Sequence, residues 1–451
     1  MSLVKSRTVN MTEGSPLKLI VKFAIPMAIG NLFQQLYNLV DSMMVGKLVS
    51  ANALAAVGAS SSVTFLFFAL CNGIGSGGGI ITSQYFGKDD EKSVKLCISN
   101  TAYLMLVFPL IIGTIAFILS KPLLILLETP ADILPDAIAY VRVMCVGIMF
   151  VSLYNFSSSM LRALGDSKTP LVFLIISCFL NIGLDALFIC TFKMGVLGAG
   201  IATLIAQLLS GVSCLIYAFK SNPYFKLSKE DLAFDREISW KAIRLGVPLS
   251  LQFSLIAISC MALQRVVNSF GPVAVAAFTA TNRAEQVIHQ PYQTISAALS
   301  TFCGQNYGAN KKDRVIKGYR QSLLLMVLFS LVMIPVMQFC STGIVKLFVD
   351  EADVIEMGAK ALRITSIFYV FLGLIYVVRG VLNGLGDAFF AFLNGIVEVF
   401  GRFFVPVFMT SIATIGLWGI WWSVGIVWFI SGFTAWLRYL GYSKRKFRVD
   451  N

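Results

Sequence analysis

The chain has 451 residues, of which 57% are hydrophobic and only 13% charged, and its mean hydropathy is +0.79. Soluble domains carry about 25% charged residues, so this composition excludes a soluble globular protein. The net charge of +13 would suit a nucleic-acid-binding protein. Most basic residues, however, lie in loops on one side of the apolar runs, so we interpret the charge as membrane topology and expect no nucleic-acid partner.

Twelve apolar runs separated by polar loops are long enough to cross a bilayer, which takes about 20 helical residues. The predicted spans are 19–45, 54–84, 94–119, 137–161, 170–191, 196–219, 242–268, 273–301, 318–341, 359–382, 389–413 and 416–438. An even number of spans puts both termini on one side, and the excess of Lys and Arg there predicts that this side is cytoplasmic. We therefore expect an all-α, multi-pass protein of the inner (plasma) membrane.

The first span carries a polar stripe in an apolar helix. Asp41 follows Gln34 by seven residues, Tyr37 by four and Asn38 by three, so these side chains share one helix face. A carboxylate in hydrocarbon costs about 2.5–3.5 kcal/mol, so we expect the stripe to line a cavity, with the other three residues as candidates for substrate contact. Pro26 removes a backbone hydrogen bond and predicts a bend in the same helix.

The glycine-rich run GIGSGGG (73–79) lies inside the second span. A phosphate-binding loop would need a preceding strand, and none is predicted here. Small residues let membrane helices approach closely, so we interpret the run as a packing surface.

Polar residues also occur in the fifth and sixth spans. Asn181 and Asp185 are four residues apart, and Thr203 follows in the sixth span. Two interpretations of Asp41 with these residues stay open. Two carboxylates in one dry pocket would bind a proton as a coupled pair, whereas two carboxylates with an amide and a hydroxyl oxygen would suit a hard cation such as Na⁺.

The second half has a different charge pattern, because its spans contain basic as well as acidic residues. We expect these residues to be buried, with Glu398 and Arg402 paired at four-residue spacing. His289 follows Glu285 by four residues and is either a proton relay or a structural neighbour of that carboxylate. Arg379 is assigned to the cytoplasmic side. The possible polar cluster of this half comprises Arg265, Arg283, Glu285, His289, Glu398 and Arg402.

His289 is the only histidine, and the nine cysteines lie singly, mostly within apolar runs. This pattern predicts neither a disulfide framework nor a structural zinc site. The first apolar run is long enough to span and no cleavage site follows it, so a removable signal peptide is not expected. No nucleophile–base pair or metal-ligand cluster is evident, so we expect neither an enzyme nor a resident cofactor.

The sequence repeats itself at an interval of 221 residues. SQYFGKDDEK (83–92) recurs as GQNYGANKKD (304–313), and MLRALGD (160–166) recurs as VLNGLGD (381–387). We therefore predict two homologous six-helix lobes, 1–219 and 242–451, joined by a cytoplasmic linker, 220–241. Since each lobe has an even number of spans, the repeats should be parallel, about a pseudo-two-fold axis along the membrane normal, as in some secondary transporters.

These features resemble the multidrug and toxic compound extrusion (MATE) transporters over nearly the whole chain. The matching stretches are Pro26 with QQLYNLVD (34–41), ALAAVG, QYFGKDD, LRALGDSKTP, NIGLD and GQNYGANKKDR. The resemblance implies a two-lobed exporter that exchanges organic cations or other amphipathic compounds for inward H⁺ or Na⁺. It also implies a bend at Pro26.

In the prokaryotic branch that this chain resembles, the cation site is formed by an Asp on helix one, an Asn and an Asp on helix five, and a Thr on helix six. The resemblance therefore assigns cation coupling to Asp41, Asn181, Asp185 and Thr203. Another branch uses a Glu on helix seven, but residues 246–264 contain no acid. We therefore favour coupling in the first lobe.

Two functions fit these observations. The first is a secondary active multidrug exporter that works by alternating access of its two lobes, as a monomer, on small cationic or amphipathic compounds. The alternative is a flippase for lipid-linked precursors of the same superfamily, which would use arginines such as Arg265, Arg283 and Arg402 to hold a phosphate headgroup. Membrane lipids are expected partners in either case.

Overall fold

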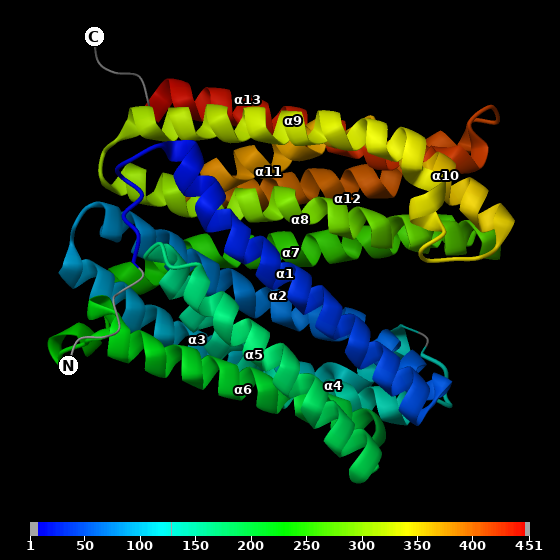
Figure 1. The fold of residues 1–451 in the computed structure, drawn as a ribbon, viewed down its shortest axis with the longest axis horizontal. Coiled ribbons are helices and arrows are strands. Elements are labelled where there is room, and N and C mark those ends of the chain that lie inside the picture. The colour runs from blue at the N-terminus through cyan, green and yellow to red at the C-terminus, as the bar shows by residue number, and fades with distance from the viewer. Residues whose placement is uncertain (1–7, 128, 447–451) are drawn as a thin grey trace. The chain divides into compact units, whose positions relative to one another are not determined.

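The computed structural model describes residues 8–127 and 129–446, and within these ranges the chain is almost entirely helical, without strands (Figure 1). The helices of the first half are α1 (Pro16–Met44), α2 (Ala51–Gly87), α3 (Glu91–Leu126), α4 (Leu134–Ala163), α5 (Lys168–Asp185) and α6 (Gly195–Ser221). Those of the second half are α7 (Arg236–Asn268), α8 (Pro272–Gly308), α9 (Lys312–Val345), α10 (Ala352–Ser366), α11 (Tyr369–Gly384), α12 (Ala388–Ser411) and α13 (Gly419–Lys446). Two short π-helices, η1 (Val45–Val49) and η2 (Ala186–Thr191), follow α1 and α5.

Among the described residues, ten helices are long and apolar enough to cross a membrane, and the bent pair α10–α11, with 55° between its parts, makes an eleventh candidate. The remaining long helix, α8, has 37 residues and coincides with the predicted span 273–301, but Arg283, Glu285 and His289 lower the hydropathy of its middle. Each of the twelve predicted spans thus corresponds to one helix or one bent pair. The prediction of an all-α polytopic fold is confirmed.

The chain forms two compact units. Of the described residues, unit 1 contains those up to Met11 and those within 22–251, and unit 2 contains 12–21 and those from 252 onward. Both α1 and α7 are therefore divided. The first turns of α1 belong to unit 2, and the first half of α7 belongs to unit 1.

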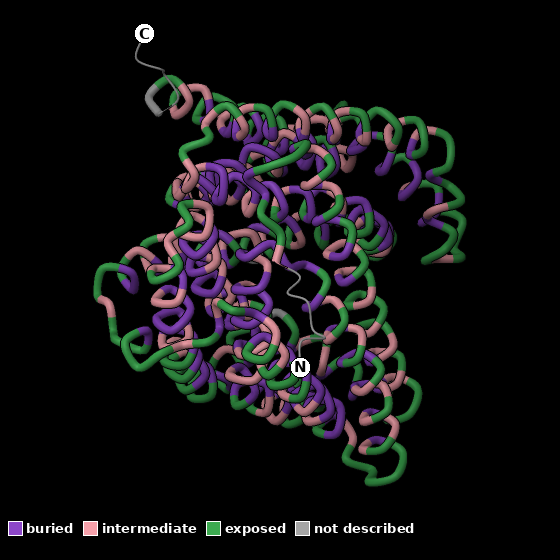
Figure 2. Tube along the Cα trace, turned by 60° about the vertical axis from the view of Figure 1, so that its left-hand side comes forward, coloured by how far each residue is buried: buried purple, intermediate pink, exposed green. Residues whose placement is uncertain are grey.

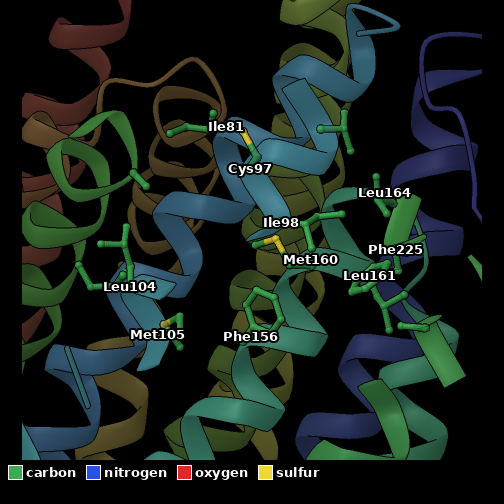
Figure 3. Close-up of a cluster of buried hydrophobic side chains, with 14 of the residues drawn as sticks. Ile81, Cys97, Ile98, Leu104, Met105, Phe156, Met160, Leu161, Leu164 and Phe225 are labelled. Carbon is green, nitrogen blue, oxygen red and sulfur yellow. The ribbon is translucent and has the colours of Figure 1, made fainter. Parts of the chain in front are cut away.

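A buried apolar cluster joins α2, α3 and α4 in unit 1 (Figure 3). Met160 of α4 and Ile98 of α3 are almost fully buried in it, and Phe225, from the short helix η3 (Pro223–Phe225), contributes a side chain with no exposed surface. The segment between α6 and α7 is thereby anchored to unit 1. Its backbone is also bound to α3, because Ser99 donates to the carbonyl oxygen of Asp231 (2.5 Å).

The repeat also appears in the backbone. Three pairs of residues 221 positions apart have a left-handed backbone conformation. They are Gly165 (φ 84°) with Gly386 (φ 86°), Asp89 (φ 61°) with Asn310 (φ 56°), and Gly195 (φ 58°) with Gly416 (φ 51°). Only Gly, and less readily Asn or Asp, adopts this conformation without strain. The two halves therefore share turn geometry as well as sequence.

The glycine-rich run of α2 packs directly against α7 within unit 1. A Cβ atom added at Gly77 would lie 2.6 Å from the carbonyl oxygen of Ala242 and from the backbone nitrogen of Gly246. A Cβ at Gly73 would lie 2.5 Å from the carbonyl oxygen of Gly246. Backbone atoms leave no room for a side chain at these positions, which confirms the interpretation of the run as a packing surface.

Buried and exposed residues alternate along the helices, and the exposed ones include many large apolar side chains (Figure 2). Phe339 is 85% exposed, Leu126 77% and Phe408 66%. Soluble monomers rarely expose apolar surface of this extent. Lipid chains, by contrast, solvate it without penalty, so these faces suit a bilayer.

Candidate functional site

Asp41 of α1 and Asp185 of α5 meet inside unit 1. Asp41 is 9% exposed and Asp185 is fully buried, and the two carboxyl groups lie close enough to interact directly. An ionised carboxylate only accepts hydrogen bonds. Two carboxyl groups in this contact therefore need a proton, or a cation in its place, between their oxygen atoms.

Asn181 and Thr203 lie beside this pair. The Asn181 side-chain nitrogen donates to the Thr203 hydroxyl oxygen at 3.3 Å, and both side chains are buried. Asn181 precedes Asp185 by one turn of α5, so the bond connects the acidic end of α5 to α6. It also orients the amide, which leaves the carbonyl oxygen at the end of the group opposite Thr203.

Both acids stand at the change from α-helix to π-helix. Asp185 is the last residue of α5 and directly precedes η2, while Asp41 lies one turn before η1. The two π-helices contact each other. Single π-helical turns are rare and occur frequently at functional sites, and nothing in the sequence indicates them here.

Tyr37 and Tyr140 complete the electrostatic neighbourhood of the two acids. Each tyrosine lies within Coulombic range of Asp41 and Asp185. Tyr140 comes from α4 and is 7% exposed. The sequence analysis did not select Tyr140, because no polar residue of the predicted span 137–161 lies three or four residues from it.

A narrow crevice, too tight for a water molecule, is lined by Asn181 and Thr203. Its lining includes residues that the sequence analysis did not select, namely Ser177, Cys178 and Gln207. Ser177 precedes Asn181 by four residues and Gln207 follows Thr203 by four, so extending each polar face by one turn would have found them.

The polar stripe of α1 is divided in the structure. Tyr37, partly buried, lines the crevice, whereas Gln34 and Asn38 are exposed. Asn38 precedes Asp41 by three positions, which rotates its side chain by about 60° around the helix from that of Asp41. Pro26 lies within α1, which continues through it as one helix, and the bend expected there stays a prediction.

The charged residues of unit 2 do not form the single buried cluster that was expected. Arg265 and Arg283 are exposed, so their predicted burial is wrong: Arg265 lies in the last turn of α7, and Arg283 lies on the exposed face of α8. Arg379, for which the sequence analysis named no partner, lies within α11 and contacts Glu398 of α12 at 2.8 Å. The predicted pair of Glu398 and Arg402 is present at a longer distance, 3.8 Å.

Glu285 and His289 lie on α8, and each contacts a residue of another helix of unit 2. Thr365 of α10 donates to a carboxylate oxygen of Glu285, and both side chains are buried. The ring of His289 packs edge-on against Trp428 of α13, with the ring centres 5.5 Å apart. The sequence did not indicate Thr365, which is distant in the chain from both residues of α8.

A larger cavity of about 440 Å³ lies in unit 2 around the turn between α9 and α10. Charged residues of both signs line it, including Lys346, Asp350, Glu356 and Arg363. None of the residues predicted for the site lies in this cavity. Over residues 8–127 and 129–446, no group of three or more His, Cys, Asp or Glu side chains could hold a metal ion.

The MatE family model matches this chain twice, over residues 26–187 and 248–417. The chain belongs to the MatE family. Its two matched segments begin near Pro26 of α1 and at Pro248 of α7, so each half of this MatE protein carries the same family repeat.

Curated relatives from bacteria cover most of this MatE protein. The probable multidrug resistance protein YpnP of Bacillus subtilis is 32% identical over 84% of each chain. The multidrug export protein MepA of Staphylococcus aureus is 25% identical over 91% of each chain.

Solved structures of similar proteins agree with the fold. A multidrug resistance MATE family transporter in an outward-facing conformation has a TM-score of 0.88 and 25% identity, covering 98% of this chain and 99% of that one. A transporter of the MOP superfamily from Pyrococcus furiosus has a TM-score of 0.89, with the same identity and coverage. This MatE protein is therefore a member of a family of membrane transporters.

Proposed function

We propose that this MatE protein is a secondary active multidrug exporter that exchanges amphipathic or cationic organic compounds for H⁺ or Na⁺. The names of its relatives YpnP and MepA support the class of cargo. The observation that carries the coupling proposal is the contact between the buried carboxyl groups of Asp41 and Asp185.

Ion occupancy would control the force between two helices. When both carboxylates are ionised and no ion lies between them, they repel each other strongly, because burial removes most of the screening by water. A proton or Na⁺ between them turns this repulsion into attraction. Since Asp41 belongs to α1 and Asp185 to α5, binding and release of the ion would change the position of α1 relative to α5, and a bend at Pro26 would accommodate that change.

The donor set allows either ion. A proton needs only the two carboxyl groups, which would share it in a short hydrogen bond. Na⁺ is a hard cation that takes oxygen ligands, and the Asn181 carbonyl and the Thr203 hydroxyl would add two neutral oxygens to the carboxylates. In both cases the proposed cycle is alternating access of the two lobes, driven by an inward ion gradient across a plasma membrane with both termini on the cytoplasmic side.

The flippase alternative has less support. It needs cationic side chains that hold a phosphate headgroup, but Arg402 and Arg379 both contact Glu398, which offsets part of their charge. Arg265 and Arg283 are exposed rather than gathered in a buried pocket. An acidic, buried pair in unit 1 instead favours exchange of cations.

Efflux of a fluorescent cation from proteoliposomes tests the proposal, with a Na⁺ gradient and a pH gradient imposed separately. We expect one gradient to drive efflux, and Asp41→Asn or Asp185→Asn to reduce efflux to the level of protein-free vesicles. Asp136→Asn, an exposed acid at the start of α4, is the matched control and should retain full efflux. Undiminished efflux in either buried variant would refute the proposal.

The variant Thr203→Val distinguishes between Na⁺ and H⁺ as the coupling ion. It removes a neutral oxygen ligand but neither carboxyl group. If Na⁺ is the coupling ion, this variant should need a several-fold higher Na⁺ concentration for half-maximal efflux; if H⁺ is the ion, efflux should be nearly unchanged.

A further inference from the structure

Glu285 is a buried acid of unit 2 that the Asp41–Asp185 mechanism does not use. Its side chain lies in the middle of α8 and is 7% exposed. Among the residues that the structure describes, no Lys, Arg or His lies within ion-pair distance of its carboxylate. Glu398 has two such partners, Arg379 and Arg402. An ionisable group inside a membrane span that has no ion-pair partner is a candidate functional site.

The hydrogen-bond partner of Glu285 lies at a break in the helical structure. Thr365 is the second-last residue of α10, and the chain turns by 55° before α11 begins at Tyr369. Broken membrane helices supply ion sites in many secondary transporters, because their ends leave backbone polar groups for binding. The carboxylate of Glu285 therefore contacts the chain beside this break.

Thr365 can serve both protonation states of Glu285. In the ionised state its hydroxyl donates to the carboxylate, as it does in the structure. In the protonated state the acid O–H would donate to the Thr365 oxygen, and the hydroxyl could turn to the carbonyl oxygen of Leu362, 3.5 Å away. Neither state leaves a hydrogen-bond donor of this pair without an acceptor.

Further polar groups face Glu285 from the neighbouring helices. Arg402 of α12 lies within Coulombic range, and the Tyr369 hydroxyl lies beside Thr365. His289 follows on the same face of α8, within Coulombic range of Arg402 and Glu398.

Two atoms of this group, His289 Nε2 and Arg402 Nε, are buried and have no hydrogen-bond partner among the described residues. Buried polar atoms of this kind are usually satisfied by water.

We propose that Glu285 is a second proton-binding site of this transporter, separate from Asp41 and Asp185. Its carboxylate binds and releases one proton while hydrogen-bonded to Thr365, at the break between α10 and α11. Uptake converts the carboxylate to a neutral acid and changes the net charge of Glu285, Glu398, Arg379 and Arg402 from zero to +1. This charge change occurs entirely within unit 2.

Infrared difference spectroscopy of the purified full-length protein during a pH titration tests the proposal, because protonated carboxylic acids have a distinct carbonyl band. The background is the double variant Asp41→Asn/Asp185→Asn, so that unit 1 does not contribute. We expect a titrating band from one buried carboxyl group to remain and to disappear when Glu285→Gln is added. Glu356→Gln, an exposed acid of α10, is the control and should leave the band in place.

A band that survives Glu285→Gln, or that disappears with Glu398→Gln instead, would overturn the proposal. Should Glu285→Gln fail to fold, Thr365→Val gives a second measurement: loss of the donor to the ionised carboxylate should shift the midpoint of the band to higher pH, whereas Thr365→Ser should restore it. The Asp41–Asp185 proposal is judged separately, from the band that the wild type has and the double variant lacks.

Discussion

Asn100 of α3 and Gln321 of α9, 221 residues apart, hold the beginnings of two other helices by the same kind of bond. The side-chain oxygen of Asn100 accepts the backbone N–H of Asp235, just before α7, at 2.8 Å. That of Gln321 accepts the backbone N–H of Leu17, in the first turn of α1, at 3.1 Å. Each bond lies within one unit. The third helix of each repeat thus accepts a backbone N–H at the start of another helix, where that donor would otherwise be unpaired.

Replacement of Asn100 should destabilise unit 1. Its amide also donates to the carbonyl oxygen of Ala233 (3.1 Å), and its oxygen accepts the hydroxyl of Ser239 (3.0 Å). Asn100→Leu would leave these buried groups without partners, at about 1–3 kcal/mol for each group left unsatisfied. We expect a clear drop in melting temperature in detergent. The exposed Asn52 provides a matched Asn→Leu control that should change little, and equal stability of both variants would contradict this account.

The close contact between α2 and α7 predicts a strong effect of a single methyl group. Gly77→Ala would place Cβ against backbone atoms of Ala242 and Gly246, which cannot move as a side chain can. Overpacking of this kind typically costs about 1–3 kcal/mol. Gly58→Ala, in the same helix, has no atom within 4 Å of its new Cβ and should be neutral or slightly stabilising. Thermal unfolding of the two variants, compared with the wild type, decides the point.

Removing either the acid or a base from the buried ion pairs of unit 2 should lower the stability of the protein. Removing one partner of a buried pair costs about 3–5 kcal/mol. Arg379→Met leaves Glu398 with the longer ion pair to Arg402 and the hydrogen bond from Ser431, and Glu398→Gln leaves two arginines without their acid. We expect stability in the order wild type, Arg379→Met, Glu398→Gln.

The control for these variants is the Lys241–Glu237 pair, at 2.6 Å with side chains 44% and 77% exposed. Exposed pairs contribute about 0–1 kcal/mol, so Glu237→Gln should be nearly neutral. A loss as large as that of Arg379→Met would show that burial does not decide the effect.

The segment between α6 and α7 should lose stability in acid. The Ser228 backbone N–H and hydroxyl donate to Asp231 (2.8 Å each) and hold the pKa of this carboxyl below its ordinary value. A lowered pKa in the folded state stabilises the fold at pH above the ordinary value of about 3.9, and this stability is lost as pH falls through the folded pKa. Limited proteolysis at stepwise lower pH should therefore cut Ser228→Ala at a higher pH than the wild type, and coincident profiles would exclude this role of Ser228.

The sequence alone determined the features that depend on local composition. Hydropathy over windows of about 20 residues located the twelve spans, and self-similarity located the repeat. Four-residue spacing singled out Asn181 with Asp185. The small residues of the run 73–79 also indicated a packing surface, because they let membrane helices approach closely.

Only the tertiary structure decided which polar faces meet. Helical periodicity states which residues share a face, but the rotation and crossing of a helix against its neighbours depend on side-chain packing over its whole length. For this reason the contact of Asp41 with Asp185 was an expectation until α1 and α5 were placed. The partners Arg379 of Glu398 and Thr365 of Glu285 could not be named from spacing, because each pair joins helices whose relative rotation the sequence pattern leaves open.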